Sequence, residues 1–282
     1  MNIKSIFTAA VALTLGLTAC NKEESLSQNG LPVNAVRITA SVGNPFAATR
    51  SNPLGTEAEQ AKFDSGDIIY VLTTNNLKGY YEFDGATWNI SDIYGSSLKW
   101  MNDKQSFYAH YPITGSNFPK ETVELDQSIL HKINLSDLMY GELIGVSKGE
   151  TLNFVMQRQT SRIVVKIGGF APEFSNDSKV TDVKIEAKYS TYSNYYTPYE
   201  QGEGYKNSTY TLLKDASMDD LYIKLKVGDK EMTSSVLTNM QKGNSYTFNL
   251  VVGKEKLEIG SVTVADWSTK EIITGGEVEE RS

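Results

Sequence analysis

Residues 221–227 read Leu-Tyr-Ile-Lys-Leu-Lys-Val, so that an apolar side chain alternates with a tyrosine or a lysine. Successive side chains of a β-strand point to opposite faces of its sheet, and this alternation therefore predicts a strand with one buried face. Working outward, comparable short runs recur between clusters of Gly, Asn, Asp and Ser, which form turns. These runs cover residues 36–42, 68–72, 80–83, 87–90, 98–101, 106–111, 151–156, 163–167, 183–187, 246–252 and 257–267. The pattern predicts an all-β protein.

Two features refine this expectation. Asp84-Gly85 lies between two of the runs, and Asp-Gly in that position predicts a β-hairpin. The alternation after Leu257 changes phase at Gly260, which predicts a β-bulge. We expect two consecutive antiparallel β-sandwiches, over residues 35–157 and 158–282.

The first residues have the pattern of a secretory signal: Lys4 in a positive start, an apolar run and a small-residue exit before Cys20. Leu17-Thr18-Ala19-Cys20 resembles a bacterial lipobox, in which the cysteine is acylated. Residues 1–19 would then be the signal peptide and residues 20–34 a polar tether. Lys22-Glu23-Glu24 resembles the tag that sends Bacteroides-type lipoproteins across the outer membrane. The alternative is an ordinary signal peptide with an incidental cysteine.

Composition argues against several classes of function. The formal net charge is −7, whereas a nucleic-acid partner requires clustered Lys and Arg. With one cysteine and two histidines, His110 and His131, the sequence offers no zinc motif, and we expect no metal and no cofactor. Motifs for nucleophilic or phosphate chemistry are missing from the sequence, so we do not expect an enzyme. We interpret the aspartates that could serve calcium as turn residues: Asp64, Asp67, Asp84 and Asp92.

The order of several motifs resembles the fimbrillin family, the subunits and accessory proteins of type V pili. The lipobox and the 36–42 strand come first, followed by Thr49-Arg50. The remaining motifs are Phe63-x-x-Gly66-Asp67-x-Ile69, Leu98-Lys99-Trp100, Phe107-Tyr108-Ala109-His110-Tyr111-Pro112, Asp137-Leu138-Met139-Tyr140-Gly141, Leu152-x-Phe154 with Ser161-x-Ile163, Gly243-x-x-Tyr246 and Val262-x-Val264-x-Asp266-Trp267. Gln157-Arg158-Gln159 stands where family members often have histidine, which leaves the subfamily open. The resemblance implies that each sandwich is transthyretin-like.

The resemblance also implies an assembly mechanism. An arginine-specific maturation protease would cut between Arg50 and Ser51 and remove the first strand, with Val36, Ile38, Ala40 and Val42. The groove left behind would be filled by a strand from another fimbrillin-like subunit. The donor candidate is residues 257–273, with the side chains Leu257, Ile259, Val262, Val264 and Trp267. Two alternatives stay open: Arg50 is one more exposed arginine, and residues 257–267 are the last strand of their own sandwich.

A tyrosine-rich stretch suggests a recognition surface, because tyrosine offers a large rigid contact area at a small entropy cost. The candidate residues are Tyr189, Tyr192, Tyr195, Tyr196 and Tyr199. The alternative is that these tyrosines cover an edge hairpin.

The function predicted from the sequence is therefore a structural subunit, tip or anchor protein of a surface pilus that contributes to cell adhesion. It would be held by lipid on the outer membrane, facing outward, and would enter the fimbrium after processing. The alternative is a non-polymerising surface lipoprotein that binds glycan or host protein.

Overall fold

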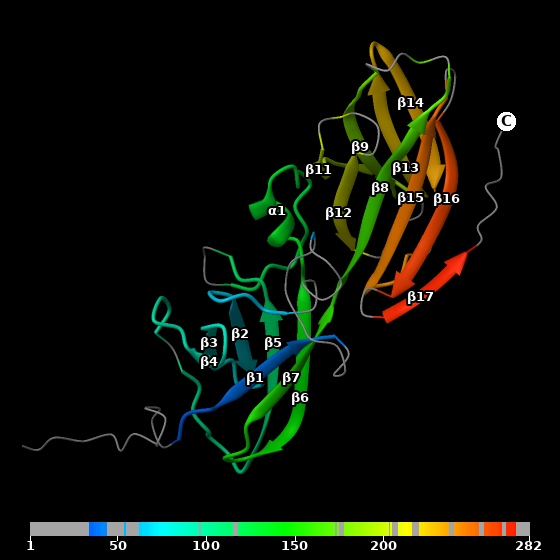
Figure 1. Ribbon diagram of the computed structural model, residues 1–282. Helices are drawn as coiled ribbons and strands as arrows, with labels where there is room; N and C mark the ends of the chain where they lie inside the picture. Colours follow the sequence, from blue (N-terminus) through cyan, green and yellow to red (C-terminus); the bar gives the residue numbers. More distant parts are fainter. Residues whose placement is uncertain are drawn as a thin grey trace, which may run out of the picture. The chain divides into compact units, whose positions relative to one another are not determined.

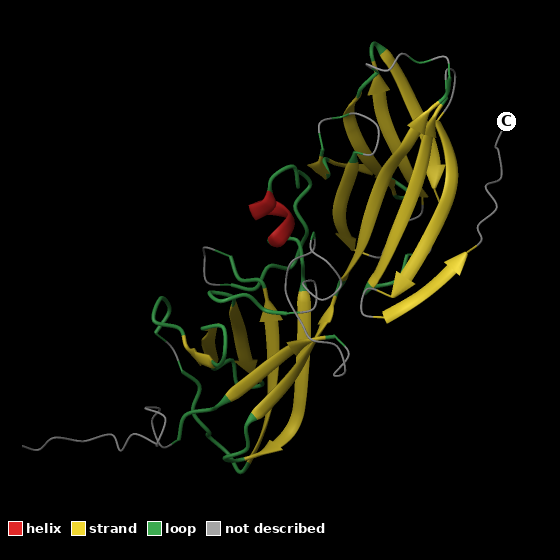
Figure 2. Ribbon diagram, viewed as in Figure 1, coloured by secondary structure: helices red, strands yellow, loops and turns green. Residues whose placement is uncertain are grey.

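A computed structural model describes residues 34–43, 54, 62–95, 97–114, 118–172, 174, 178–202, 204, 208–215, 220–236, 240–253, 257–266 and 269–274. The chain divides into two compact units, residues 1–35 and 36–282. Only residues 34 and 35 of the first unit are described, and everything below concerns the second. That unit is built from strands, with one short helix among its described residues (Figure 2). The predicted all-β sandwich-type fold is confirmed.

The first half of the second unit forms a seven-stranded sheet with the order β1-β7-β6-β5-β2-β3-β4 (Figure 1). Its strands are β1 (Ile38–Val42), β2 (Ile68–Thr73), β3 (Lys78–Phe83), β4 (Trp88–Ile90), β5 (Lys104–Tyr111), β6 (Met139–Ser147) and β7 (Leu152–Arg158). Side chains from both edge strands, such as Ile38 of β1 and Trp88 of β4, belong to one hydrophobic cluster. The sheet therefore curls over its own core, as the two sheets of a sandwich do.

The second half contains two sheets. The four-stranded sheet has the order β10-β9-β13-β14, and the six-stranded sheet has the order β11-β12-β8-β15-β16-β17. The bounds are β8 (Thr160–Phe170), β9 (Val180–Lys188), β10 (Ser193–Tyr196), β11 (Tyr199–Gln201), β12 (Thr209–Asp215), β13 (Asp220–Val227), β14 (Lys230–Val236), β15 (Asn244–Val252), β16 (Leu257–Asp266) and β17 (Thr269–Thr274).

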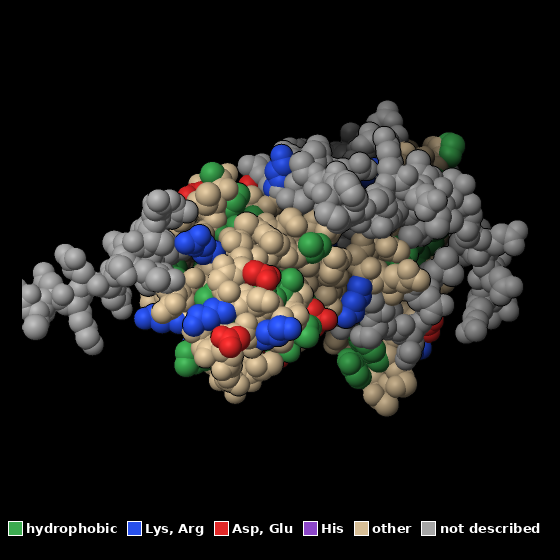
Figure 3. All heavy atoms as spheres, turned by 90° about the horizontal axis from the view of Figure 1, so that it is seen from below, with side chains coloured by type: hydrophobic (Ala, Val, Ile, Leu, Met, Phe, Trp, Pro, Cys, Tyr) green, Lys and Arg blue, Asp and Glu red, His purple; other side chains and the backbone are tan. Residues whose placement is uncertain are grey.

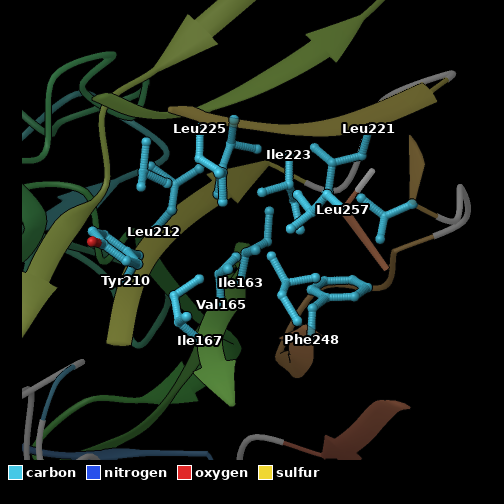
Figure 4. Packing of buried hydrophobic residues seen from close by; sticks show 14 of the residues in the cluster. Ile163, Val165, Ile167, Tyr210, Leu212, Leu221, Ile223, Leu225, Phe248 and Leu257 are labelled. Carbon is cyan, nitrogen blue, oxygen red and sulfur yellow. The ribbon is translucent and has the colours of Figure 1, made fainter. Parts of the chain in front are cut away.

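The core of this half lies between its two sheets. Leu221 and Ile223 of the four-stranded sheet share one hydrophobic cluster with Ile163 and Phe248 of the six-stranded sheet (Figure 4). β13, the strand 220–227, alternates strictly between buried and partly exposed residues after Asp220, as its sequence predicts. This cluster spans residues 163–257 and the first cluster spans residues 36–156. The division into two consecutive sandwiches over residues 35–157 and 158–282 stays a prediction.

Two local predictions are confirmed. Phe83 pairs with Trp88 across a hairpin, and the Asp84 carboxylate accepts hydrogen bonds from the N–H groups of Ala86 and Thr87 at 2.8 and 2.7 Å. The second confirmed feature is the bulge, because Asn249 pairs with Ser261 while Leu250 pairs with Ile259, leaving Gly260 as the extra residue.

Two features are not predicted by the sequence. β1 is parallel to β7, and β8 is parallel to β15, although the other strand pairs within the described residues are antiparallel. The segment between β5 and β6 contains a helix, α1 (Leu130–Asn134), which is too short to show a helical period. The helix buries Ile133.

Candidate strand-exchange site

The strand that the sequence marks as removable lies at the edge of the first sheet (Figure 1). Among the described strands, β1 pairs with β7 alone, in parallel register from Ile38 opposite Leu152 to Val42 opposite Met156. An edge strand has one neighbour, so its departure breaks one ladder of backbone hydrogen bonds and leaves the edge of β7 unpaired. β1 is therefore the kind of strand that another strand can replace.

The side chains of this segment provide the apolar side of the exchange. Val36, Ile38 and Val42 are buried in the first core, and Ala40 packs against that core. They alternate with exposed Arg37 and Thr39, as a half-buried strand requires. Thr39 Oγ1 donates a hydrogen bond to Asn153 Oδ1 of β7 at 2.7 Å on the exposed side. Removing the segment would thus open an apolar groove, because the departing side chains line the core.

Backbone hydrogen bonds fix both ends of the segment. Val36 N donates a hydrogen bond to Leu98 O at 2.9 Å, and the carbonyl oxygen of Val36 accepts one from the hydroxyl of buried Tyr81 at 3.1 Å. Burial raises the pKa of that hydroxyl, which therefore remains a donor. At the other end, Gly43 N donates to Met156 O at 2.8 Å.

The donor candidate, residues 257–273, consists of two different strands. β16 pairs with β15 from Asn244 opposite Asp266 to Val252 opposite Leu257, and it pairs with β17 on its other side. Leu257 is buried in the second core (Figure 4), and Ile259 and Val262 pack against that core. The backbone of Val264 lies in the same strand. β16 is therefore built into the chain's own sheet.

β17 is the edge strand of that six-stranded sheet. It pairs with β16 at three positions, Thr263 opposite Thr274, Val264 opposite Ile273 and Asp266 opposite Thr269. The alignment shifts between Val264 and Asp266. Of the two strands in the donor candidate, β17 would break fewer backbone pairings with its neighbouring strand on leaving the sheet.

Two of the predicted recognition tyrosines, Tyr189 and Tyr196, lie against one buried lysine. Lys214 is fully buried, and its ammonium group donates a hydrogen bond to the hydroxyl of Tyr189 at 2.9 Å. The same ammonium lies 5.2 Å from the ring centre of Tyr189 and 5.8 Å from that of buried Tyr196. Tyr192 stacks on Tyr189, with ring centres 4.5 Å apart. Cation–π contacts stabilise the buried charge, so these rings have a structural role.

The other predicted tyrosines differ in exposure. Tyr199 is half-buried and packs against Ile133 and Leu213. Tyr195 is 52 % exposed and Tyr192 is 57 % exposed. The predicted tyrosine set therefore contains two residues that are open to a partner, Tyr192 and Tyr195.

The two histidines do not form a site. His110 is half-buried between the rings of Tyr70 and Tyr140, whereas His131 is exposed on α1. In the described ranges, no group of three or more His, Cys, Asp or Glu side chains is placed to hold a metal ion. Likewise, no helix in the part of the chain that the structure describes is long and apolar enough to cross a membrane.

On the face shown in Figure 3, the visible Lys, Arg, Asp and Glu side chains are interspersed.

Four predicted site residues lie outside the described residues: Cys20, Arg50, Ser51 and Trp267. Leu54 is the described residue that follows the predicted cleavage site, and it packs against Ile133 and Leu213. Sequence reasoning missed the buried side chain of Gln127, which hydrogen-bonds to the main chain of Leu213. No periodic signal marks a glutamine of this kind.

Comparison with known proteins gives one family. The sequence pattern of the fimbrillin-like family matches residues 55–267, which is more than half of the chain. A comparison with curated proteins found no match. The chain resembles the crystal structure of a candidate cell adhesion protein from Bacteroides ovatus, with a TM-score of 0.60 and 14% identity over 84% of this chain and 99% of that chain. It also resembles a candidate cell adhesion protein from Bacteroides uniformis, with a TM-score of 0.55 and 15% identity over 86% and 99%.

Proposed function

Because this chain belongs to the fimbrillin-like family, we propose that it is a structural subunit or an accessory tip or anchor protein of a surface pilus. Its role is pilus-related and contributes to cell adhesion. In this proposal the chain reaches the outer membrane as a lipoprotein acylated on Cys20. A protease then cuts between Arg50 and Ser51, and the removed strand is replaced by a strand of another fimbrillin-like subunit.

A single observation carries the proposal: β1 is an edge strand whose side chains nevertheless complete the first core. Val36, Ile38 and Val42 together leave the core when the strand leaves. Burying a side chain of this kind stabilises a protein by about 1.5–3 kcal/mol, so the binding of another strand in the empty groove is strongly favourable. The backbone N–H and C=O groups of β7 that lose β1 also favour the binding of a new strand, since buried groups of this type need hydrogen-bond partners.

The neighbourhood of the predicted cleavage site supports the same proposal. Gly43 is hydrogen-bonded to β7, and Leu54 packs against Ile133 and Leu213. Arg50 and Ser51 lie in the sequence between Gly43 and Leu54. After cleavage, Leu54 keeps the new N-terminal end on the body of the protein, while the strand on the other side of the cut is free to leave.

Within the donor candidate, we assign the exchanging strand to β17 rather than to β16. Releasing β16 would remove Leu257 from the second core, whereas β17 lies at the sheet edge and pairs, among the described strands, with β16 alone. The 257–267 segment then serves as the last core strand of its own sandwich, and the donor is the C-terminal part of the predicted range. Strand addition of this kind gains affinity from main-chain hydrogen bonds.

The test uses the purified full chain and an arginine-specific protease. Uncut chain should be monomeric, and cut chain should form ladders on gels run without boiling, because an exchanged strand dissociates slowly. Arg50→Gln is the matched control and should neither be cut there nor form ladders. A chain that ends at Asp266 should be cut normally but form no ladder. Ladders from the Asp266-terminated chain would overturn the donor assignment, and ladders from uncut chain would overturn the exchange mechanism.

The second candidate, a surface lipoprotein that does not polymerise, is favoured by the place of β16. Leu257 is buried in the second core of the same chain, so most of the predicted donor range already forms part of this chain's own fold. A cut chain that stays monomeric would select this function, with adhesion as its remaining role. Glycan or host protein would then be the partner.

A further inference from the structure

We propose that the outer face of the four-stranded sheet, centred on Tyr195 and Tyr222, binds a neutral oligosaccharide. We call this surface the tyrosine face and define it by Tyr195, Glu186, Tyr222 and Lys224. It deepens the adhesive part of the proposed function, on which it rests, and it does not depend on strand exchange.

The two rings lie on one side of the sheet. Tyr195 of β10 is opposite Glu186 of β9, and Glu186 is opposite Tyr222 of β13. The neighbours Leu221 and Ile223 point into the core, so Tyr222 points outward. Neighbouring strands are about 4.8 Å apart, which separates the two tyrosine strands by roughly 10 Å. A short oligosaccharide spans such a distance and can place an apolar ring face on each tyrosine.

The polar groups between the rings are held in place. Glu186 accepts a hydrogen bond from the hydroxyl of Tyr195 at 3.0 Å and forms an ion pair with Lys224 at 2.7 Å. The Lys224 ammonium also lies 5.3 Å from the Tyr195 ring centre. The hydrogen bond from Lys224 lowers the pKa of Glu186, and the one to Glu186 raises the pKa of Lys224, so both remain ionised. A fixed carboxylate beside a fixed ring needs little ordering when a ligand arrives.

The charges of the face balance one another. Lys226 pairs with Asp182 at 3.0 Å and with Glu231 at 3.4 Å, next to the Lys224–Glu186 pair. The other cations on this side of the sheet are Lys184, whose ammonium group donates to Thr197 Oγ1 at 2.7 Å, and exposed Lys188, which is opposite Asp220 of β13. On this side of the sheet, four lysines thus accompany four carboxylates among the described residues, and a charged ligand would gain no net attraction. Sugar hydroxyls both donate and accept hydrogen bonds, so they can bind paired ions without supplying a counter-charge.

A protein partner suits this face less well. Protein interfaces are depleted of charge at their centre and are anchored by residues that become fully desolvated. Here Glu186, which forms an ion pair with Lys224, is opposite both Tyr195 and Tyr222. Covering it with protein would desolvate a charge pair, which often gains nothing. The hydroxyl groups of a saccharide can replace the water at this pair with hydrogen bonds of their own.

The chain offers a matched control for Tyr195. Tyr192 is exposed to a similar degree, but it stacks on Tyr189 beside buried Lys214 and is not part of the tyrosine face. Alanine at either position removes one exposed ring. Tyr195→Phe keeps the ring and removes only the hydroxyl that bonds to Glu186.

The experiment measures binding of the purified full chain to neutral tetrasaccharides of glucose, mannose, galactose and xylose by titration calorimetry. At least one should bind, Tyr195→Ala should weaken that binding about tenfold or more, and Tyr195→Phe and Tyr192→Ala should stay within about threefold of the parent chain. Absence of saccharide binding, equal losses in the two alanine variants, or Tyr195-dependent binding to protein alone would overturn the inference. Ladder formation by Tyr195→Ala should be normal, so failure of saccharide binding is distinguishable from failure of assembly.

Discussion

The side-chain amide of Gln127 pairs with the main chain of Leu213 in the way that a neighbouring strand would. Gln127 Nε2 donates to Leu213 O at 2.7 Å, and Leu213 N donates to Gln127 Oε1 at 2.9 Å. Gln127 is wholly buried, and its own N–H donates to Thr197 O at 2.8 Å. The side chain of Gln127, which lies between β5 and β6, therefore supplies hydrogen-bond partners to the main chain of β12 in the six-stranded sheet. That sheet thus depends on a residue outside the predicted second sandwich.

Replacing this glutamine should destabilise the protein. Gln127→Leu keeps the approximate volume but leaves the N–H and C=O of Leu213 buried without partners. Each orphaned group costs about 1–3 kcal/mol, so we expect a loss of about 3 kcal/mol in the free energy of unfolding. Urea denaturation of the full chain measures this loss. Gln157→Leu, at an exposed position of β7, is the control and should change little. Equal stability of the two variants would show that the pairing contributes nothing.

The buried ion pair Arg158–Asp137 gives a second prediction. Arg158 Nε lies 2.9 Å from Asp137 Oδ1, and Nη2 lies 3.1 Å from Oδ2, with both side chains buried. Asp137→Asn keeps the shape and leaves the guanidinium without its carboxylate, which should cost about 3–5 kcal/mol of unfolding free energy. Asp126→Asn removes an exposed ion pair with Lys132 and should have a much smaller effect. Equal effects in denaturant titrations would contradict the account.

The environment of His110 predicts a pH dependence. Burial lowers the pKa of His110 below its ordinary value of 6.5, and Glu121 opposes this shift. The unfolded chain therefore binds the proton more tightly, so the stabilisation is complete above pH 6.5 and is lost as the pH falls toward the folded-state pKa. Between pH 7.5 and 5.5, His110→Asn should lose less stability than the parent chain. Gln157→Leu, which removes no titratable group, should keep the pH profile of the parent chain. A parent-like pH profile in His110→Asn would refute the prediction.

Lipid attachment is tested at Cys20. Cys20→Ala should abolish metabolic lipid labelling and move the protein from the membrane fraction to the soluble fraction, because the sequence contains no other cysteine to carry the acyl chains. Cys20→Ser is a second variant with the same expected result. Continued labelling of either variant would identify another attachment site.

The sequence predicted those parts of the structure that leave a local periodic signal. The strict alternation of β13 and the phase change at Gly260 each follow from one short segment, and both are found in the structure. The parallel partner of β1 could not be predicted, because alternation says which face is buried but not which distant strand lies alongside. The pairing of Ile38 with Leu152 is of that kind.

The tyrosines show the same limit within one segment. Tyr192 and Tyr196 lie in the same tyrosine-rich segment, yet Tyr192 is exposed and Tyr196 is buried, with its ring near the Lys214 ammonium group. Their difference comes from β12, which supplies Lys214 from a later part of the chain. The pairing of Gln127 with Leu213 is also a long-range contact, and no local propensity marks it.

The most direct test of the central claim, removal of β1 by cleavage after Arg50, is the N-terminus of the protein taken from the cell surface. Mass spectrometry of the N-terminal peptide measures it, with cells expressing Arg50→Gln as the matched control. Ser51 should be the first residue of the parent chain, and acylated Cys20 should be the first residue of the variant. Acylated Cys20 at the N-terminus of all surface-exposed parent protein would contradict removal of the first strand.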